Sequence, residues 1–306
     1  TPGGRAAGFI DRIFRMSVAY TERAETRSTA VAPAWLFVGA GIYLLLLIHG
    51  DGLLRDADTF WQIKVGQWIA AHHAVPFTDI YSFTRAGEPW ISTSWLAQVL
   101  FAQAFDVGGW AGVVVLTALA AAGAYTLLAH ALCRFLPPLQ VGVVICAVFV
   151  LASPHLLARP HVLAMPVMIA WASGLVSASR RGNAPSPWLL PLMIAWVNLH
   201  GSFVFGLALI GAFALDALWN AEAGRRKRVA LGWTLFGVAA LGASGVTPYG
   251  WGSLLAVRNI LGLGKALSLI VEWRPADFSH VSAIEVCLLG LFGLALFRGV
   301  RLTLPR

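Results

Sequence analysis

Residues 51–95 of this 306-residue chain read DGLLRDADTFWQIKVGQWIAAHHAVPFTDIYSFTRAGEPWISTSW. They form the longest polar interruption before residue 220 and follow the first long apolar run of the sequence. The stretch is rich in aspartate and tryptophan, and tryptophan gathers where a membrane meets water. We therefore expect a site at the boundary between lipid and water.

The composition indicates a membrane protein. Hydrophobic residues make up 58% of the chain and charged residues 12%, about half of what soluble domains carry. The mean hydropathy is +0.74. Runs of about 20 apolar residues recur, and no alternating strand pattern accompanies them, which predicts an all-α polytopic fold. The net charge of +8 lies in short basic clusters between apolar runs, so it indicates topology and not a nucleic-acid partner. The three cysteines show neither paired nor metal-binding spacing.

The basic clusters fix the expected topology, because Lys and Arg concentrate on the cytoplasmic side. Residues 1–32 are a basic cytoplasmic tail, residues 33–299 hold about eight spans, and residues 300–306 return to the cytoplasm. Residues 51–107 form the first extracytoplasmic loop. Its short apolar segment 92–106 does not cross, since a crossing would move the clusters at 180 and 225 outside. This arrangement places 15 of the 22 Lys and Arg in the cytoplasm.

Two further features predict local structure in the outer region. Residues 59–73 read as a helix with one apolar stripe, which we expect to rest on the membrane with its tryptophans down. Residues 187–197 are too few to span the bilayer, so Asn198–Gly201 should turn within its outer half. A polar turn at that depth needs protein or a wet cavity beside it.

The same topology gathers unusual polar residues on the outer face. Arginine forks suit phosphate, carboxylates suit removal of a hydroxyl proton, and the apolar walls suit a lipid chain. Ionisable residues at membrane depth are candidates for function. The candidate catalytic residues are Asp56 and Asp58, and the candidate substrate-binding residues are Arg159, His161, His200, Tyr249, Glu272 and Arg274.

Several motifs resemble a branch of the bacterial membrane glycosyltransferases of the GT-C superfamily. The loop carries DADTFW at 56–61, GQWI at 66–69, PFTDIYSFT at 76–84 and GEPW at 87–90. Later pieces that look similar are RPH at 159–161, WVNLHG at 196–201, PYG at 248–250 and EWRPADF at 272–278. The likeness extends over nearly the whole chain after residue 33.

The resemblance implies a transferase of the bacterial inner membrane. A sugar would pass from a polyprenyl-phosphate donor to an acceptor on the extracytoplasmic side. Asp56 or Asp58 would act as base or orient the acceptor, Arg159 and Arg274 would hold the donor phosphate, and His200 would line the cavity. Some members of the superfamily bind a divalent metal at such an acidic pair, so Asp56 and Asp58 are candidate ligands for Mg²⁺ or Mn²⁺.

Other interpretations stay open at this point. The chain is shorter than many GT-C enzymes, which favours the alternative of a non-catalytic GT-C-like subunit that binds lipid or partner membrane proteins. A transporter ranks last, because no matching broken helices occur in two halves. Asp58 could also simply cap the helix that follows it, and Arg159 could reach toward lipid head groups.

Overall fold

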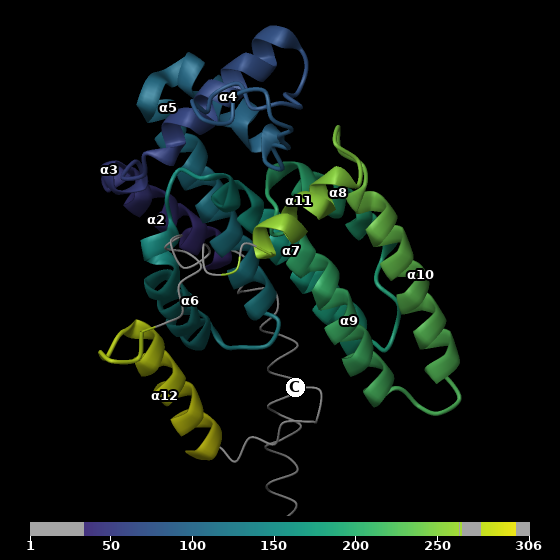
Figure 1. Cartoon of the computed structure of the whole chain (residues 1–306). Helices are drawn as coiled ribbons and strands as arrows, with labels where there is room; N and C mark the ends of the chain where they lie inside the picture. The colour runs from purple at the N-terminus through teal and green to yellow at the C-terminus, as the bar shows by residue number, and fades with distance from the viewer. Residues whose placement is uncertain (1–33, 263, 265–276, 298–306) are drawn as a thin grey trace, which may run out of the picture.

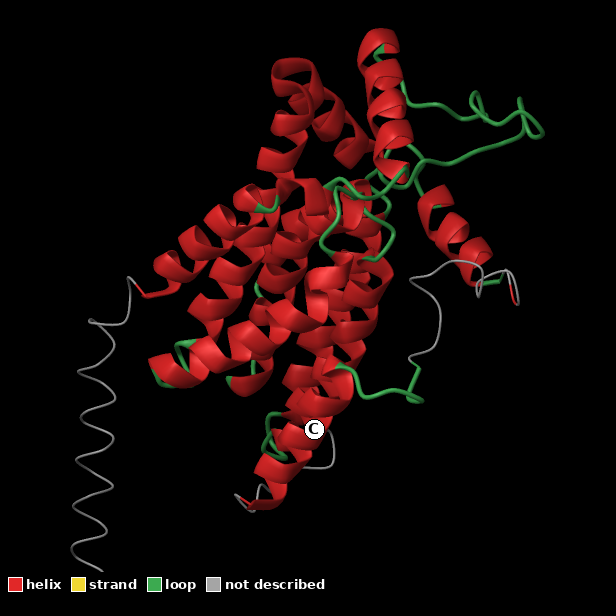
Figure 2. Ribbon diagram, turned by 90° about the vertical axis from the view of Figure 1, so that its left-hand side faces the viewer, coloured by secondary structure: helices red, strands yellow, loops and turns green. Residues whose placement is uncertain are grey.

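The computed structural model describes residues 34–262, 264 and 277–297. The two tails that the sequence predicts, 1–32 and 300–306, lie outside these residues. The described chain is helical, with a single isolated β-bridge between Thr78 and Pro89 in the loop after the fourth helix. The all-α expectation is therefore confirmed (Figures 1 and 2).

Eleven α-helices and two short 3₁₀ turns follow one another in the described residues, and the first of these helices is labelled α2. Four stretches are long and apolar enough to cross a membrane: Trp95–Leu132, Pro138–His155, Pro160–Arg180 and Phe203–Asn220. Shorter apolar helices cover Ala34–Ile48, Pro187–Leu199 and Ala283–Gly293. The described helices are α2 (Ala34–Ile48), α3 (Gly50–Leu53), α4 (Asp58–His72), α5 (Trp95–Leu132), α6 (Pro138–Ala152), α7 (Pro160–Arg180), α8 (Leu190–Leu199), α9 (Phe203–Asn220), α10 (Arg226–Ser244), α11 (Gly252–Leu261) and α12 (Ala283–Phe297), with 3₁₀ turns at Ser153–His155 and Pro187–Leu189.

The bundle has two chemically different ends. The basic end carries the Lys and Arg at 134, 180–181 and 225–228, and Arg225 reaches Asn183 across it. The acidic end carries Asp56 and Asp58, next to the start of α7. Helix α7 runs from the acidic to the basic end over 21 residues, about 30 Å. In Figure 1, α4 and the start of α5 lie at the top, and the loop joining α9 to α10 lies at the bottom.

Helix α5 is two helices joined by a sharp turn. Its 38 residues hold one non-helical position, Gly109, with φ 58° and ψ −147°, a conformation open to glycine. A Cβ on Gly112 would overlap the backbone carbonyl of Ala104, so the chain folds back there. The first half, 95–108, packs on α4, and the second half, 110–132, runs antiparallel to α2, with Gly39 against Thr126 and Gly50 against Val114. The short apolar segment 92–106 is thus separate from the long helix that follows it.

Helix α4 forms as expected, and part of its predicted apolar stripe packs against protein, while its placement on a membrane surface stays a prediction. Val65 and Ile69 of that stripe are buried against protein, while Trp61 is 40% exposed. Gly66 explains the packing, because a Cβ there would overlap the backbone of Gln98. Gln98 also donates to Gln62 at 2.9 Å and accepts from Ser92 at 2.7 Å, so a buried polar chain joins the two helices.

The core of the later half is built on three fully buried tryptophans. Trp171, Trp196 and Trp233 expose at most 2% of their surface. Each indole N–H finds an acceptor at 2.9–3.0 Å, namely Gly206 O, Ser202 Oγ and Asn183 O, respectively. Because buried indoles need such partners, these bonds align α7, α8 and α10 along the bundle.

Candidate functional site

The aspartate pair lies where α3 gives way to α4. Helix α4 begins at Asp58, and the Oδ1 of Asp56 accepts the backbone N–H of Asp58 at 2.9 Å. The backbone carbonyl of Asp56 accepts the N–H of Thr59 at 3.3 Å. The first N–H groups of a helix lack partners within it, so Asp56 serves the helix start. The alternative that Asp58 is the cap is therefore wrong, and its side chain is available for another contact.

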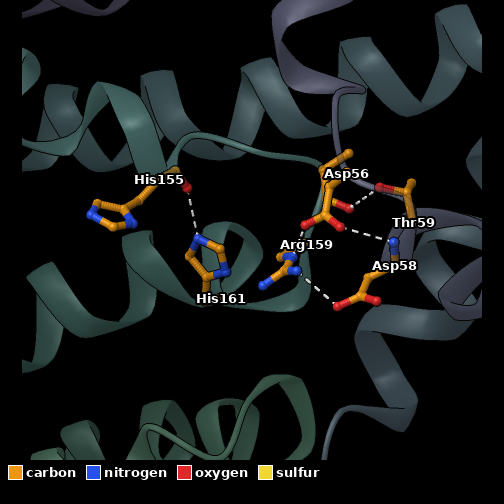
Figure 3. Close-up of polar contacts among 7 residues, drawn as sticks. Asp56, Asp58, Thr59, His155, Arg159 and His161 are labelled. Atoms are coloured by element: carbon orange, nitrogen blue, oxygen red, sulfur yellow. Dashed lines mark hydrogen bonds and ion pairs between the residues drawn. The ribbon is translucent and has the colours of Figure 1, made fainter. Parts of the chain in front are cut away.

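That contact is Arg159, which bridges both carboxylates (Figure 3). Its Nε pairs with Oδ2 of Asp56, and its Nη2 donates to Oδ2 of Asp58 at 2.8 Å. The Asp56 side chain is 10% exposed, Arg159 22% and Asp58 51%. The structure thus brings together three residues that the sequence singled out, across 101 positions. We call Asp56, Asp58 and Arg159 the triad.

Backbone contacts fix the triad from both sides. Ala158 donates its N–H to Leu53 O at 2.8 Å, and its carbonyl accepts the Thr59 hydroxyl at 3.1 Å. Arg159 stands in extended backbone with φ −123° and ψ 155°, because Pro160 follows it and opens α7. The segment before α7 is therefore pinned beside the start of α4. Thr59, which is 1% exposed, is a positioning residue that the sequence did not reveal.

The two carboxylates of the triad make different contacts. Both oxygens of Asp56 are engaged, one by Arg159 and one by the start of α4. Asp58 uses Oδ2 for Arg159 and is half-exposed, so it is the carboxylate better placed to meet a substrate. The position between the carboxylates is taken by a guanidinium. Among the described residues no group of three or more His, Cys, Asp or Glu gathers. Mg²⁺ or Mn²⁺ at Asp56 and Asp58 would have to displace the guanidinium and take its remaining ligands from water and phosphate.

Two histidines extend the site along the start of α7. The ring of His161 lies 6.0 Å from that of His200, and its Nε2 lies 2.8 Å from the carbonyl of His155. In Figure 3, His161 lies on the far side of Arg159 from Asp58. Nδ1 of His200 accepts the Ser202 N–H at 3.2 Å, which places the proton of the neutral ring on Nε2.

Tyr249 ties the loop of residues 73–94 to the bundle, and Asn198 ties the start of α5 to α8 and to the segment after α10. The Tyr249 hydroxyl donates to Pro76 O at 2.8 Å, and burial raises its pKa. Asn198 donates to Ile194 O at 2.7 Å and to Val246 O at 2.9 Å, and it accepts the indole N–H of Trp95 at 2.7 Å. The polar turn after α8 is therefore satisfied at Asn198 by protein.

The remaining predicted residues, Glu272 and Arg274, lie outside the described residues. Two cavities of the described chain lie at the basic end, away from the triad. Comparisons with protein-family models, curated proteins and solved structures find no match for this chain.

Proposed function

We propose that the chain is a membrane glycosyltransferase of GT-C type. It transfers a sugar from a polyprenyl-phosphate donor to an acceptor at the acidic end. The observation that carries the proposal is the triad, which holds two carboxylates and one arginine together at the end of an apolar bundle opposite its basic end. The acid–base and phosphate-binding groups of such a transfer are those three.

The proposal includes a topology of about eight spans in a bacterial inner membrane, with both termini in the cytoplasm. Its support is the alternation of direction along the bundle. Helices α2, α6, α8 and α10 run from the basic toward the acidic end, and the second half of α5, α7 and α9 run back. Together with α12 they make eight segments. The positive-inside rule then puts the triad on the extracytoplasmic side.

The geometry of the triad supports the following roles in this proposal. Asp58 takes the proton of the acceptor hydroxyl as the acceptor oxygen attacks the anomeric carbon. The bond from that carbon to the phosphate oxygen breaks, its electron pair leaves with the polyprenyl phosphate, and the configuration at the carbon inverts. Arg159 holds the leaving phosphate by charge-assisted hydrogen bonds. Asp56, with both oxygens engaged, positions Arg159. No step requires a metal.

The neighbouring residues have supporting roles. His161 follows Arg159 on the first turn of α7 and, with His200, lines the sugar side of the site. Tyr249 holds the loop of residues 73–94 in place through Pro76. Glu272 and Arg274 complete the donor site in this proposal.

The first test is a comparison of aspartate variants. We expect Asp58→Asn to lower the turnover number at least 100-fold, because a general base contributes about 10²- to 10⁴-fold. Asp51→Asn, an exposed carboxylate on α3, is the matched control and should retain full turnover. The assay follows transfer from a panel of short polyprenyl-phosphate sugars. Full turnover in both Asp58→Asn and Asp56→Asn would rule out the mechanism.

A binding experiment examines the donor. Lipid extracted from purified wild-type protein and from Arg159→Ala is compared by mass spectrometry. We expect a polyprenyl-phosphate species in the wild-type extract that is lost in the variant. Only bulk phospholipid in both extracts would count against the donor.

A second function has one observation in its favour. The carboxylates of the triad are neutralised inside the protein, as in a purely structural ion pair that joins α4 to α7. On this alternative the chain is a non-catalytic GT-C-like subunit of a larger membrane complex. Two results together would support this alternative. The chain would co-purify stably with other membrane subunits, and the wild-type chain would transfer no sugar in any assay of the panel.

A further inference from the structure

The basic end carries a strong excess of positive charge around the ends of α7 and α9. The Lys and Arg at 134, 180–181 and 225–228 lie here, and the described residues at this end include two carboxylates, Asp216 and Glu222. Contacts hold these cations close together. Arg225 donates to Asn183 Oδ1 at 3.2 Å, and the guanidinium of Arg180 lies 4.3 Å from the ring centre of Phe135. Several fixed cations thus share one small surface.

Two cavities open between these side chains, and Arg181 lines both. One, of about 180 Å³, lies between the ends of α7 and α9 and is lined by Arg180, Arg181, Asn220 and Arg225. The other, of about 190 Å³, is lined by Arg134, Arg181, Ser173, Ser177 and Ser186. Guanidinium and hydroxyl donors are the groups that bind phosphate oxygens. Each volume is large enough for a phosphate group with part of its substituent.

The arginines of the first cavity keep donors for a ligand. A guanidinium has five N–H donors, and the bonds of Arg225 to Gly182 and Asn183 use one of its three nitrogens. The stacking of Arg180 on Phe135 leaves its in-plane N–H groups directed away from the ring. Arg181 donates from Nη1 to the Ser177 hydroxyl and keeps the donors of its other nitrogens. These three arginines can therefore bind a phosphate from several directions.

The buried carboxylate beneath the first cavity does not oppose this. Asp216 is 5% exposed, accepts from the Ser179 hydroxyl, and accepts from Asn220 Nδ2 at 3.1 Å. Its oxygens thus point into a network with α7 and with its own helix. Glu222 lines the cavity, and three arginines outnumber it.

We propose that the cavities flanking Arg181 form a binding site for a phosphate monoester or diester, such as the head group of an anionic phospholipid. The chain lies in a membrane by composition, and basic pockets between membrane helices are suited to such head groups. The site lies at the opposite end of α7 from the triad and does not depend on the proposed transfer.

The test uses two double variants that remove the same charge from the same end. Arg181→Gln/Arg225→Gln removes cations that line the cavities, and Lys227→Gln/Arg228→Gln removes exposed cations that line neither. Each protein is placed in mixed micelles of phosphatidylglycerol and phosphatidylcholine, and retained lipid is counted by native mass spectrometry. We expect the first variant to lose about 30-fold in preference for phosphatidylglycerol, from two cations at roughly 1 kcal/mol each. The second variant should keep the wild-type preference.

The source of the phosphate is distinguished by a second arm. If millimolar inorganic phosphate binds the wild type, fails to bind the first variant, and removes the retained phosphatidylglycerol, a soluble phosphate compound uses the site. If it leaves the lipid in place, the lipid is the ligand. Two results would overturn the proposal. One is an equal loss of lipid in both double variants. The other is a wild-type protein that shows no preference for phosphatidylglycerol over phosphatidylcholine and does not bind phosphate. Circular dichroism checks that both variants keep their helices.

Discussion

At the scale of the residue, Arg159 compensates the negative charges of the triad. It is the cation between two carboxylates, one of which, Asp56, is 10% exposed. Removing one partner of a buried pair leaves a charge without compensation, which costs more than the pair contributes. We expect Arg159→Met to lower the free energy of unfolding by about 3 kcal/mol. The measurement is thermal unfolding in detergent, followed by tryptophan fluorescence.

A variant without the carboxylates is the control for that experiment. The triple variant carries Arg159→Met, Asp56→Asn and Asp58→Asn. It leaves no charge of the triad buried, so we expect it to recover a large part of the stability that the single variant loses. If the single variant were as stable as the wild type, the pairing would be a weak surface contact and the positioning role of Asp56 would fail.

Much of the site could be predicted from the sequence, and the rest depends on packing. The sequence predicted that Asp56, Asp58 and Arg159 lie at the same end of the bundle, because each stands beside an apolar run whose direction the basic clusters indicate. The sequence could not tell which aspartate accepts an N–H at the start of α4, since both Asp56 and Asp58 are favoured residues before a helix. In the structure Asp56 accepts that N–H, and Asp58 instead contacts Arg159, 101 positions away. The contact of Thr59 with Ala158 was equally hidden, because it joins segments 99 positions apart.

At the scale of the element, the crossing of α4 over the first half of α5 depends on Gly66. A Cβ at this position would overlap the carbonyl of Gln98, and backbone does not give way as a flexible side chain does. We expect Gly66→Ala to lower the free energy of unfolding by about 2 kcal/mol, within the range for overpacking. Chemical or thermal unfolding in detergent measures it.

The control for Gly66 is another helical glycine with open space around it. Nothing lies within 4 Å of a Cβ built on Gly41 in α2, so Gly41→Ala should leave stability unchanged or raise it slightly. Equal effects of the two substitutions would mean that helix propensity, and not the close crossing, sets the response.

At this scale the sequence leaves two features open. Of the stripe expected on α4, Val65 and Ile69 are buried and Trp61 is 40% exposed. An apolar stripe does not say whether protein or lipid covers it. Here the first half of α5 covers the buried part, through Gly66 and the Gln62–Gln98 bond. The second feature is the fold-back at Gly109, which needs a positive φ that glycine allows. Many other glycines in apolar helices serve only close packing. The sequence therefore could not show which glycine interrupts the helix.

At the scale of the whole molecule, hydropathy and charge were sufficient for the helical class and for the two ends. Basic clusters that are far apart in sequence gather at one end of the bundle, as the positive-inside rule requires of a membrane protein. The number of crossings is harder to obtain, because α2, α8 and α12 are each shorter than a full span. Helices of this length cross only if they are lengthened by neighbouring segments or by local thinning of the bilayer.

Cysteine labelling would determine which side each end faces. With the three native cysteines replaced by serine, one new cysteine is introduced at a time, as Ala86→Cys in the loop after α4, Val107→Cys before the turn of α5, or Ala223→Cys between α9 and α10. All three positions are exposed. In spheroplasts a maleimide that cannot cross membranes should label positions 86 and 107. It should reach position 223 only after permeabilisation, because the proposed topology places the basic end in the cytoplasm. If position 86 were labelled and position 107 were not, residues 95–108 would cross the bilayer. Every later helix would then run in the opposite direction across the membrane, and the two ends of α7 would lie on the opposite sides from those proposed.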